Sequence, residues 1–145
     1  MEILIASDHA GWELKEAVKG FLVKEGHTVR DLGPQDTQSV DYPVYGKLLA
    51  KEISEGKAEQ GILICGTGIG MSMTANRFPG VRAALCQDPF CARLSREHNN
   101  ANVLCLGGRI IGVGMALEIV KVWIAAPFAA EGRHDRRVKM IEERG

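Results

Sequence analysis

The sequence predicts a three-layer α/β/α sandwich built on a five-stranded parallel sheet. Two observations carry the prediction: five short apolar or β-branched runs are spread along the 145 residues, and stretches of helical length lie between them. Strands that alternate with helices form right-handed crossover units, which make the strands parallel and cover both faces of the sheet. A chain of this length fits one domain, residues 1–145.

The expected elements follow from apolar runs and from the glycines and prolines between them. The expected strands are 3–6, 28–32, 61–65, 81–86 and 102–106. Glycine and proline mark helix ends, and they predict helices over about 12–26, 42–55, 68–77, 89–98, 112–126 and 133–144. Pro127 is expected to stop the fifth helix. The sixth is expected to be short and polar, with Val138 and Ile141 on its apolar side.

Composition and charge exclude several classes of function. The 18 basic and 18 acidic side chains give a formal charge of zero, so no net field would hold a polyanion, and nucleic acid is not an expected partner. No apolar run approaches the roughly 18 residues that a membrane span needs. The first residues enter an apolar run without a basic region or a cleavage-site pattern. We therefore expect a cytoplasmic protein.

The four cysteines have no metal-site spacing. They lie 21, 5 and 14 residues apart, which matches neither CxxC pairs nor a Cys/His zinc array. Cys86, Cys91 and Cys105 fall in apolar or helical stretches, so each is expected to be a small buried hydrophobe. Cys65 differs from these three because of the segment that follows it.

The segment Cys65-Gly66-Thr67-Gly68-Ile69-Gly70 follows an expected strand and is the most informative part of the sequence. Its glycines let the backbone turn tightly, and the N–H groups can converge on negative charge. It is neither a dinucleotide fingerprint, whose third glycine would fall on Met71, nor a P-loop, since no Gly-Lys-Ser/Thr follows. A thiol beside such amides can be held as thiolate and act as a base, although a buried structural cysteine in a simple tight turn is the alternative.

Other polar residues lie at the ends of expected elements. Asp8 follows the first strand and is either the N-cap of the next helix or a ligand of the substrate. His9 is placed to donate to an anion or a sugar oxygen, and an ordinary polar surface position is the alternative. His98, near a helix C-terminus, suits either a proton donor or a surface C-cap. Arg109 follows Gly107-Gly108 at the carboxyl end of the last strand, an edge where ligands bind in parallel sheets.

Two arginines share one face of the expected terminal helix. Arg133 and Arg137 are four residues apart, so their charges repel unless an anion lies between them. The planar guanidinium suits a phosphate monoester, and a solvated basic face is the alternative.

Taken together, these segments resemble the ribose-5-phosphate isomerase type B family, which also includes galactose-6-phosphate and allose-6-phosphate isomerases. The resemblance spans nearly the whole chain, and the joint order of its segments makes it specific. The segments are Ser7-Asp8-His9-Ala10-Gly11, Asp41-Tyr42-Pro43, the run from Gly61 to Gly70, Ser95-Arg96-Glu97-His98-Asn99, Gly107-Gly108-Arg109, and Gly132-Arg133-His134 with Arg137.

The resemblance implies a Rossmann-like homodimer, or a dimer of dimers, with active sites between subunits. It implies isomerisation of ribose 5-phosphate to ribulose 5-phosphate in the pentose phosphate pathway, with no cofactor and no metal. Cys65 would move a proton from C2 to C1 through an enediolate, while His98 of the neighbouring subunit opens the sugar ring with Thr67. The other implied roles are hydroxyl binding by Asp8, Tyr42 and Asn99, oxyanion binding by the amides of Gly66, Gly68, Ile69 and Gly70, phosphate binding by His9, Arg133 and Arg137, and a contact by Arg109 from across the interface.

Two alternatives stay open. Allose 6-phosphate and galactose 6-phosphate are one carbon longer, and the sequence does not show where the phosphate lies. A binding module for phosphate or nucleotide would use the same glycine loop. Against it, the chain has no ribose-binding acid after the first strand and no P-loop lysine.

Overall fold

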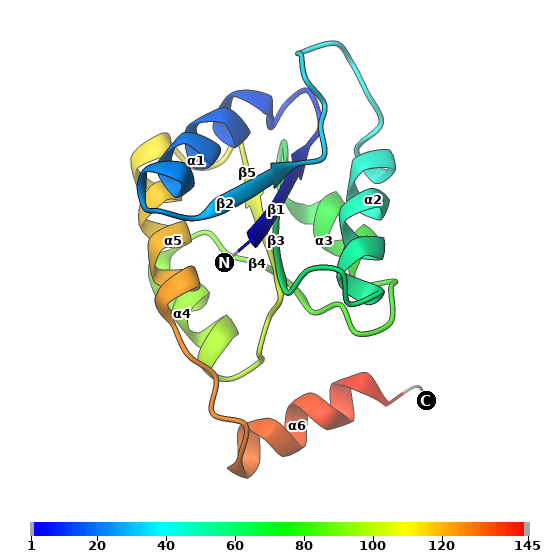
Figure 1. Cartoon of the computed structure of the whole chain (residues 1–145), viewed down its shortest axis with the longest axis vertical. Coiled ribbons are helices and arrows are strands. Elements are labelled where there is room, and N and C mark those ends of the chain that lie inside the picture. The colour runs from blue at the N-terminus through cyan, green and yellow to red at the C-terminus, as the bar shows by residue number, and fades with distance from the viewer. Residues whose placement is uncertain (1, 144–145) are drawn as a thin grey trace.

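The computed structural model describes residues 2–143 and confirms the predicted sandwich around an all-parallel, five-stranded sheet (Figure 1). The strands are β1 (Glu2–Ser7), β2 (Thr28–Asp31), β3 (Gln60–Cys65), β4 (Ala83–Leu85) and β5 (Val103–Gly107), in the order β2-β1-β3-β5-β4. From β1 the chain passes to β2 at one edge, and after β3 it passes to β4 at the other edge and returns to β5 between them. The winding therefore reverses between β1 and β3, which opens a crevice at their carboxyl ends.

Helices cover both faces of this sheet. They are α1 (Trp12–Lys24), α2 (Tyr42–Ser54), α3 (Ile69–Ala75), α4 (Pro89–Glu97), α5 (Val113–Ala125) and α6 (Gly132–Glu142). Figure 1 shows α1, α4 and α5 on one face, α2 and α3 on the other, and α6 apart from both layers, beyond the amino ends of the strands. Among residues 2–143, no helix has the length and apolar character to cross a membrane.

The side chains of each central strand alternate between two cores, as the pleat of a strand requires. In β1, Ile3 and Ile5 pack in the core beneath α1 and α5, whereas Leu4 and Ala6 pack in the core beneath α2 and α3. Cys65, the last residue of β3, belongs to the second core. Its thiol therefore faces the layer formed by α2 and α3.

Several expected element boundaries are confirmed and some are wrong. The fifth helix ends at Ala125, two residues before Pro127, as expected. The fourth strand covers only Ala83–Leu85, not 81–86, because the amide of Arg82 donates to the side chain of Asn102 at 2.8 Å. The third helix is shorter than the expected range 68–77, since it begins after Gly68 and ends at Ala75.

Two burial predictions are also wrong. Cys91 is exposed, although Cys86 and Cys105 are buried as expected. Val138 of α6 is buried, but Ile141 is 57% exposed, because this end of α6 borders an open cavity. Arg144, the expected end of the sixth helix, lies outside the described residues.

Candidate active site

A cavity of about 400 Å³ opens at the carboxyl ends of β1 and β3, on either side of the reversal in winding. A crevice at this position is the usual ligand site of an open parallel sheet. The cavity is lined by Asp8, Tyr42, Cys65, Gly66, Thr67, Ile69, Gly70, Met73 and Arg109. One chain therefore brings together the residue after β1, the glycine loop after β3 and the arginine after β5.

Cys65 is held in this cavity with a hydrogen-bond donor on its sulfur. Its side chain is nearly buried, and the amide of Gly68 donates to Sγ at 3.2 Å. Gly68 has φ 79°, and a Cβ there would lie 2.6 Å from Leu85 Cδ1 and 3.0 Å from the carbonyl carbon of Leu106. Only glycine fits this turn, which directs the amide back toward the sulfur. Such a donor stabilises negative charge on sulfur.

Asp8 and His9 follow β1. A backbone hydrogen bond from Asp8 N to Ile64 O of β3, at 3.2 Å, fixes the chain at this point. The N-cap of α1 is Gly11 and not Asp8. Asp8 Oδ1 accepts the Gly11 amide at 3.0 Å, which caps the turn that leads into α1, and the residue also lines the cavity. The Val40 amide donates to His9 Nδ1 at 3.1 Å. Because Nδ1 accepts a bond, the proton of the neutral ring lies on Nε2, which is left to donate.

Tyr42 and Arg109 complete the wall of the cavity. Tyr42 is the first residue of α2, and its ring lies so close to Gly70 that a Cβ there would come within 2.5 Å of Tyr42 Cζ. The Arg109 amide donates to Gly66 O at 3.0 Å, and its side chain lines the same cavity as Cys65. The resemblance implied that Arg109 reaches the site from across a subunit interface. In the structure, Arg109 lines the cavity of the chain to which Cys65 also belongs.

Gly70→Ala should weaken substrate binding without destabilising the fold. The added methyl group displaces the exposed end of the Tyr42 side chain, which can move, so we expect KM to rise by about tenfold. Gly20→Ala is the matched control, because Gly20 lies in α1 and a methyl group added there would have no atom within 4 Å. That variant should gain up to about 1 kcal/mol in the free energy of unfolding with an unchanged KM. Steady-state kinetics and urea titration of both variants provide the measurement, and equal KM values would contradict the prediction.

A second group of predicted site residues lies elsewhere on the chain. His98 is the C-cap of α4, and its ring stacks on that of His134 with centroids 4.1 Å apart and planes 8° apart. Arg133 and Arg137 are exposed on α6. Partial desolvation and the charges of His98, Arg133 and Arg137 lower the pKa of His134. None of these residues lines the cavity that contains Cys65.

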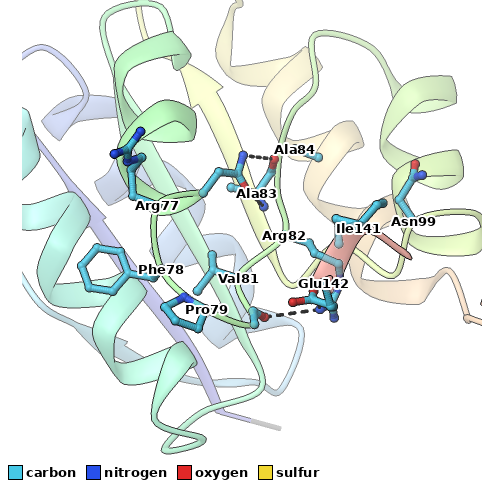
Figure 2. A pocket seen from close by; sticks show the side chains of 13 residues that line it. Arg77, Phe78, Pro79, Val81, Arg82, Ala83, Ala84, Asn99, Ile141 and Glu142 are labelled. Carbon is cyan, nitrogen blue, oxygen red and sulfur yellow. Dashed lines mark hydrogen bonds and ion pairs between the residues drawn. The ribbon is translucent and has the colours of Figure 1, made fainter. Parts of the chain in front are cut away.

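Asn99 borders a larger, separate cavity of about 660 Å³ between the end of α6 and the segment 76–84. Figure 2 shows Ile141 and Glu142 of α6 beside Arg82, which forms an ion pair with Glu142. The described residues that line it include no cysteine and no histidine. The one carboxylate among these residues, Glu142, is paired with Arg82, whereas the smaller cavity holds the thiol of Cys65 and the carboxyl group of Asp8.

Two residues near the predicted site residues, Met73 and His134, were not themselves predicted from the sequence. Met73 lines the cavity one helical turn after Ile69 and Gly70, a spacing that places all three on one side of α3. His134 stands in a motif that carries the resemblance, but its stacking on His98 depends on how α6 folds back toward α4. The helical spacing could have identified Met73, whereas nothing local indicated the stack.

Comparison with known proteins decides the family. A family profile described as Ribose/Galactose Isomerase matches residues 3–141. The chain belongs to this family. Ribose-5-phosphate isomerase B of Escherichia coli is 42% identical, with 97% of this chain and 93% of that protein covered. Galactose-6-phosphate isomerase subunit LacB of Clostridium acetobutylicum is 38% identical, with 99% and 83% covered.

The fold agrees with this family assignment. The solved structure of ribose-5-phosphate isomerase B from Clostridium thermocellum matches with a TM-score of 0.95 and 48% identity, over 98% of this chain and 95% of that one. Membership in the ribose/galactose isomerase family identifies the chain as an aldose–ketose isomerase.

Proposed function

We propose that this chain interconverts ribose 5-phosphate and ribulose 5-phosphate in the cytoplasm, with Cys65 as the base. The observation that carries the proposal is the contact between the Gly68 amide and Cys65 Sγ inside the cavity at the switch between β1 and β3. A thiolate is a suitable general base, and the amide hydrogen bond stabilises its negative charge. No cofactor and no metal take part in the proposed reaction.

The chemistry moves one proton between neighbouring carbons. Cys65 takes the hydrogen of C2, the electrons shift to the aldehyde oxygen, and an enediolate forms. The amides of Gly66, Gly68, Ile69 and Gly70 are proposed to stabilise its negative oxygen, as converging backbone donors do. The Gly68 amide donates to Cys65 Sγ and the Ile69 amide to Thr67 Oγ1, at 3.2 Å each, so these two amides must exchange those acceptors for the oxyanion once the thiol has taken the proton. Cys65 then returns the proton to C1, while the hydroxyl proton of O2 is transferred to O1. The product is the ketose, and no electrons enter or leave the sugar.

The remaining roles are assigned to a second copy of the chain. The cavity that contains Cys65 is not lined by His98, Asn99, Arg133 or Arg137 of the same chain. The reaction needs groups that bind the phosphate and an acid that opens the sugar ring, both close to Cys65. We propose a homodimer, or a dimer of dimers, in which these residues reach the partner's cavity. His98 and Thr67 then open the sugar ring, and the other roles are hydroxyl binding by Asp8, Tyr42 and Asn99, and phosphate binding by His9, Arg133 and Arg137 with Arg109 nearby.

The direct test is turnover by the purified, metal-stripped protein. Ribose 5-phosphate is supplied and ribulose 5-phosphate is followed, with allose 6-phosphate and galactose 6-phosphate in parallel. Fast turnover of the pentose alone supports the proposal. Turnover of a hexose phosphate alone keeps the reaction and changes the substrate. Absence of turnover with all three would overturn the proposal and favour a binding module.

A further inference from the structure

Lys15 of α1 has an ammonium group that is removed from solvent. The residue is fully buried, and Nζ donates to Asp31 Oδ1 and Oδ2 at 2.9 Å each and to the carbonyl oxygen of Pro34 at 2.6 Å. A buried ammonium is costly unless each of its donors finds a partner. The positions of Asp31 and Pro34 are therefore tightly coupled to α1.

Both partners belong to one connection in the chain. Asp31 ends β2, and Pro34 lies in the segment 32–41 that leads to α2, here named the β2–α2 loop. Asp31 Oδ1 also accepts the Gly33 amide at 2.8 Å, and Gly33 O accepts the Ser7 amide at 3.0 Å. The first part of the loop is thus fixed to α1 through Lys15 and to the end of β1 through Ser7.

The last part of the same loop reaches the candidate site. Val40 supplies the amide that bonds His9 Nδ1, and Tyr42, which follows the loop directly, lines the cavity. Residues 35–39 are exposed, and their one side-chain hydrogen bond in the described chain is local, from Gln38 N to Asp36 Oδ1 at 3.0 Å. The hydrogen bond from Lys15 to Pro34, here named the anchor, therefore holds the loop on one side of the exposed residues 35–39, and the bond from Val40 to His9 holds it on the other.

We propose that Lys15 is a positioning residue for substrate binding, which holds the β2–α2 loop at Pro34 so that Val40 fixes the His9 ring and Tyr42 meets the sugar. The role of Lys15 rests on the proposed isomerase function. Burial opposes ionisation of Asp31, but hydrogen bonds from Lys19, Lys15 and the Gly33 amide outweigh it and lower its pKa. The Asp31 partner of Lys15 is therefore ionised at neutral pH.

The chain offers a matched pair of substitutions for the test. Lys15→Met removes the donor to Pro34 but leaves Asp31 bonded to Lys19, whose Nζ lies 2.9 Å from Oδ2. Lys19→Met removes the other ammonium from Asp31 and leaves the donor to Pro34 intact. We expect Lys15→Met to raise KM for ribose 5-phosphate about tenfold with a much smaller change in kcat. Lys19→Met should leave both constants near the wild-type values, because its ion pair is partly exposed.

A second readout does not need turnover. The ¹⁵N shifts of the imidazole, assigned with His9→Gln, report which nitrogen carries the proton. The wild-type protein and Lys19→Met should show a single His9 tautomer with an unprotonated Nδ1, and Lys15→Met should show a mixture. A folded Lys15→Met protein with an unchanged KM and an unchanged His9 spectrum would overturn the inference. A wild-type protein without isomerase activity would instead refute the proposed function, and the His9 spectra would still test the anchor.

Lys15→Met combined with Asp31→Asn covers the case in which the single variant does not fold. This double variant removes the buried charge of Lys15 and the partly buried charge of Asp31, a change that proteins often tolerate, and the asparagine can still accept the Gly33 amide. It lacks the donor to Pro34, so the same rise in KM and the same mixture of His9 tautomers are expected. Failure of both variants to fold would overturn the positioning role in favour of a purely structural one.

Discussion

Cys65→Ala should lower kcat by about 10²–10⁴-fold, the contribution that a positioned general base makes to proton transfer. The variant keeps the cavity and its glycine loop, so KM for ribose 5-phosphate should change little. Exchange of the C2 hydrogen with solvent deuterium, followed by NMR, measures the proton-transfer step itself. Retained turnover or retained exchange in Cys65→Ala would contradict the role of the thiol.

Cys91→Ala is the control for this experiment. Cys91 is exposed on α4, and its side-chain hydrogen bond with Asp88 and partial desolvation raise the pKa of its thiol. It lies outside the candidate site, so its loss should leave kcat and KM at wild-type values. A thiol-specific effect on catalysis is thereby separated from a general effect of removing a cysteine.

Mixing two inactive variants should restore activity if two copies share each site. Cys65→Ala and His98→Ala are each expected to be inactive alone. In a mixed dimer one site contains both substitutions and the other contains neither. Random reassociation of equal amounts makes half of the dimers mixed, so about a quarter of the wild-type activity should return for a two-fold symmetric pair. The measurement is turnover after the two variants are unfolded and refolded together.

A second mixture provides the control. Asp8 and Cys65 line the same cavity of one chain, so every mixed dimer of Asp8→Ala and Cys65→Ala contains a defect in both sites. No activity should return from this mixture. Recovery in both mixtures, or in neither, would contradict a site that takes Cys65 from one copy and His98 from the other.

The fold and the smaller cavity could be predicted from the sequence because both depend on local patterns. Apolar runs mark the strands, and the carboxyl ends of parallel strands meet at one edge, which brings Asp8 and Cys65 to one cavity. The roles of these residues stay predictions. The position of Arg109 after β5 predicted its place at the ligand-binding edge, but the resemblance assigned it to the neighbouring subunit, and its place in the cavity of its own chain depends on how the turn after β5 packs on Gly66.

The buried lysine shows where sequence patterns stop being informative. Lys15 stands in an ordinary amphipathic helix, and its partner Asp31 is 16 residues further along the chain. A lysine in a helix is usually solvated, so the pattern gives no sign of burial. The short β4 and the exposed Cys91 also depend on tertiary contacts. The side chain of Asn102 takes the Arg82 amide that a longer β4 would use, and Cys91 lies on the outward face of α4.

The separation of Cys65 from α6 has a consequence for the size of sugar that fits. If two copies share each site, the thiol belongs to a rigid strand of one copy, and the arginines belong to a helix that extends from the other. The span between the reacting carbon and the phosphate is then a property of how the copies pack. In such a shared site, a shift of α6 alone would lengthen that span by the length of one more carbon and leave the residues around the reacting carbons unchanged, so the same thiol and glycine loop would serve a pentose or a hexose phosphate.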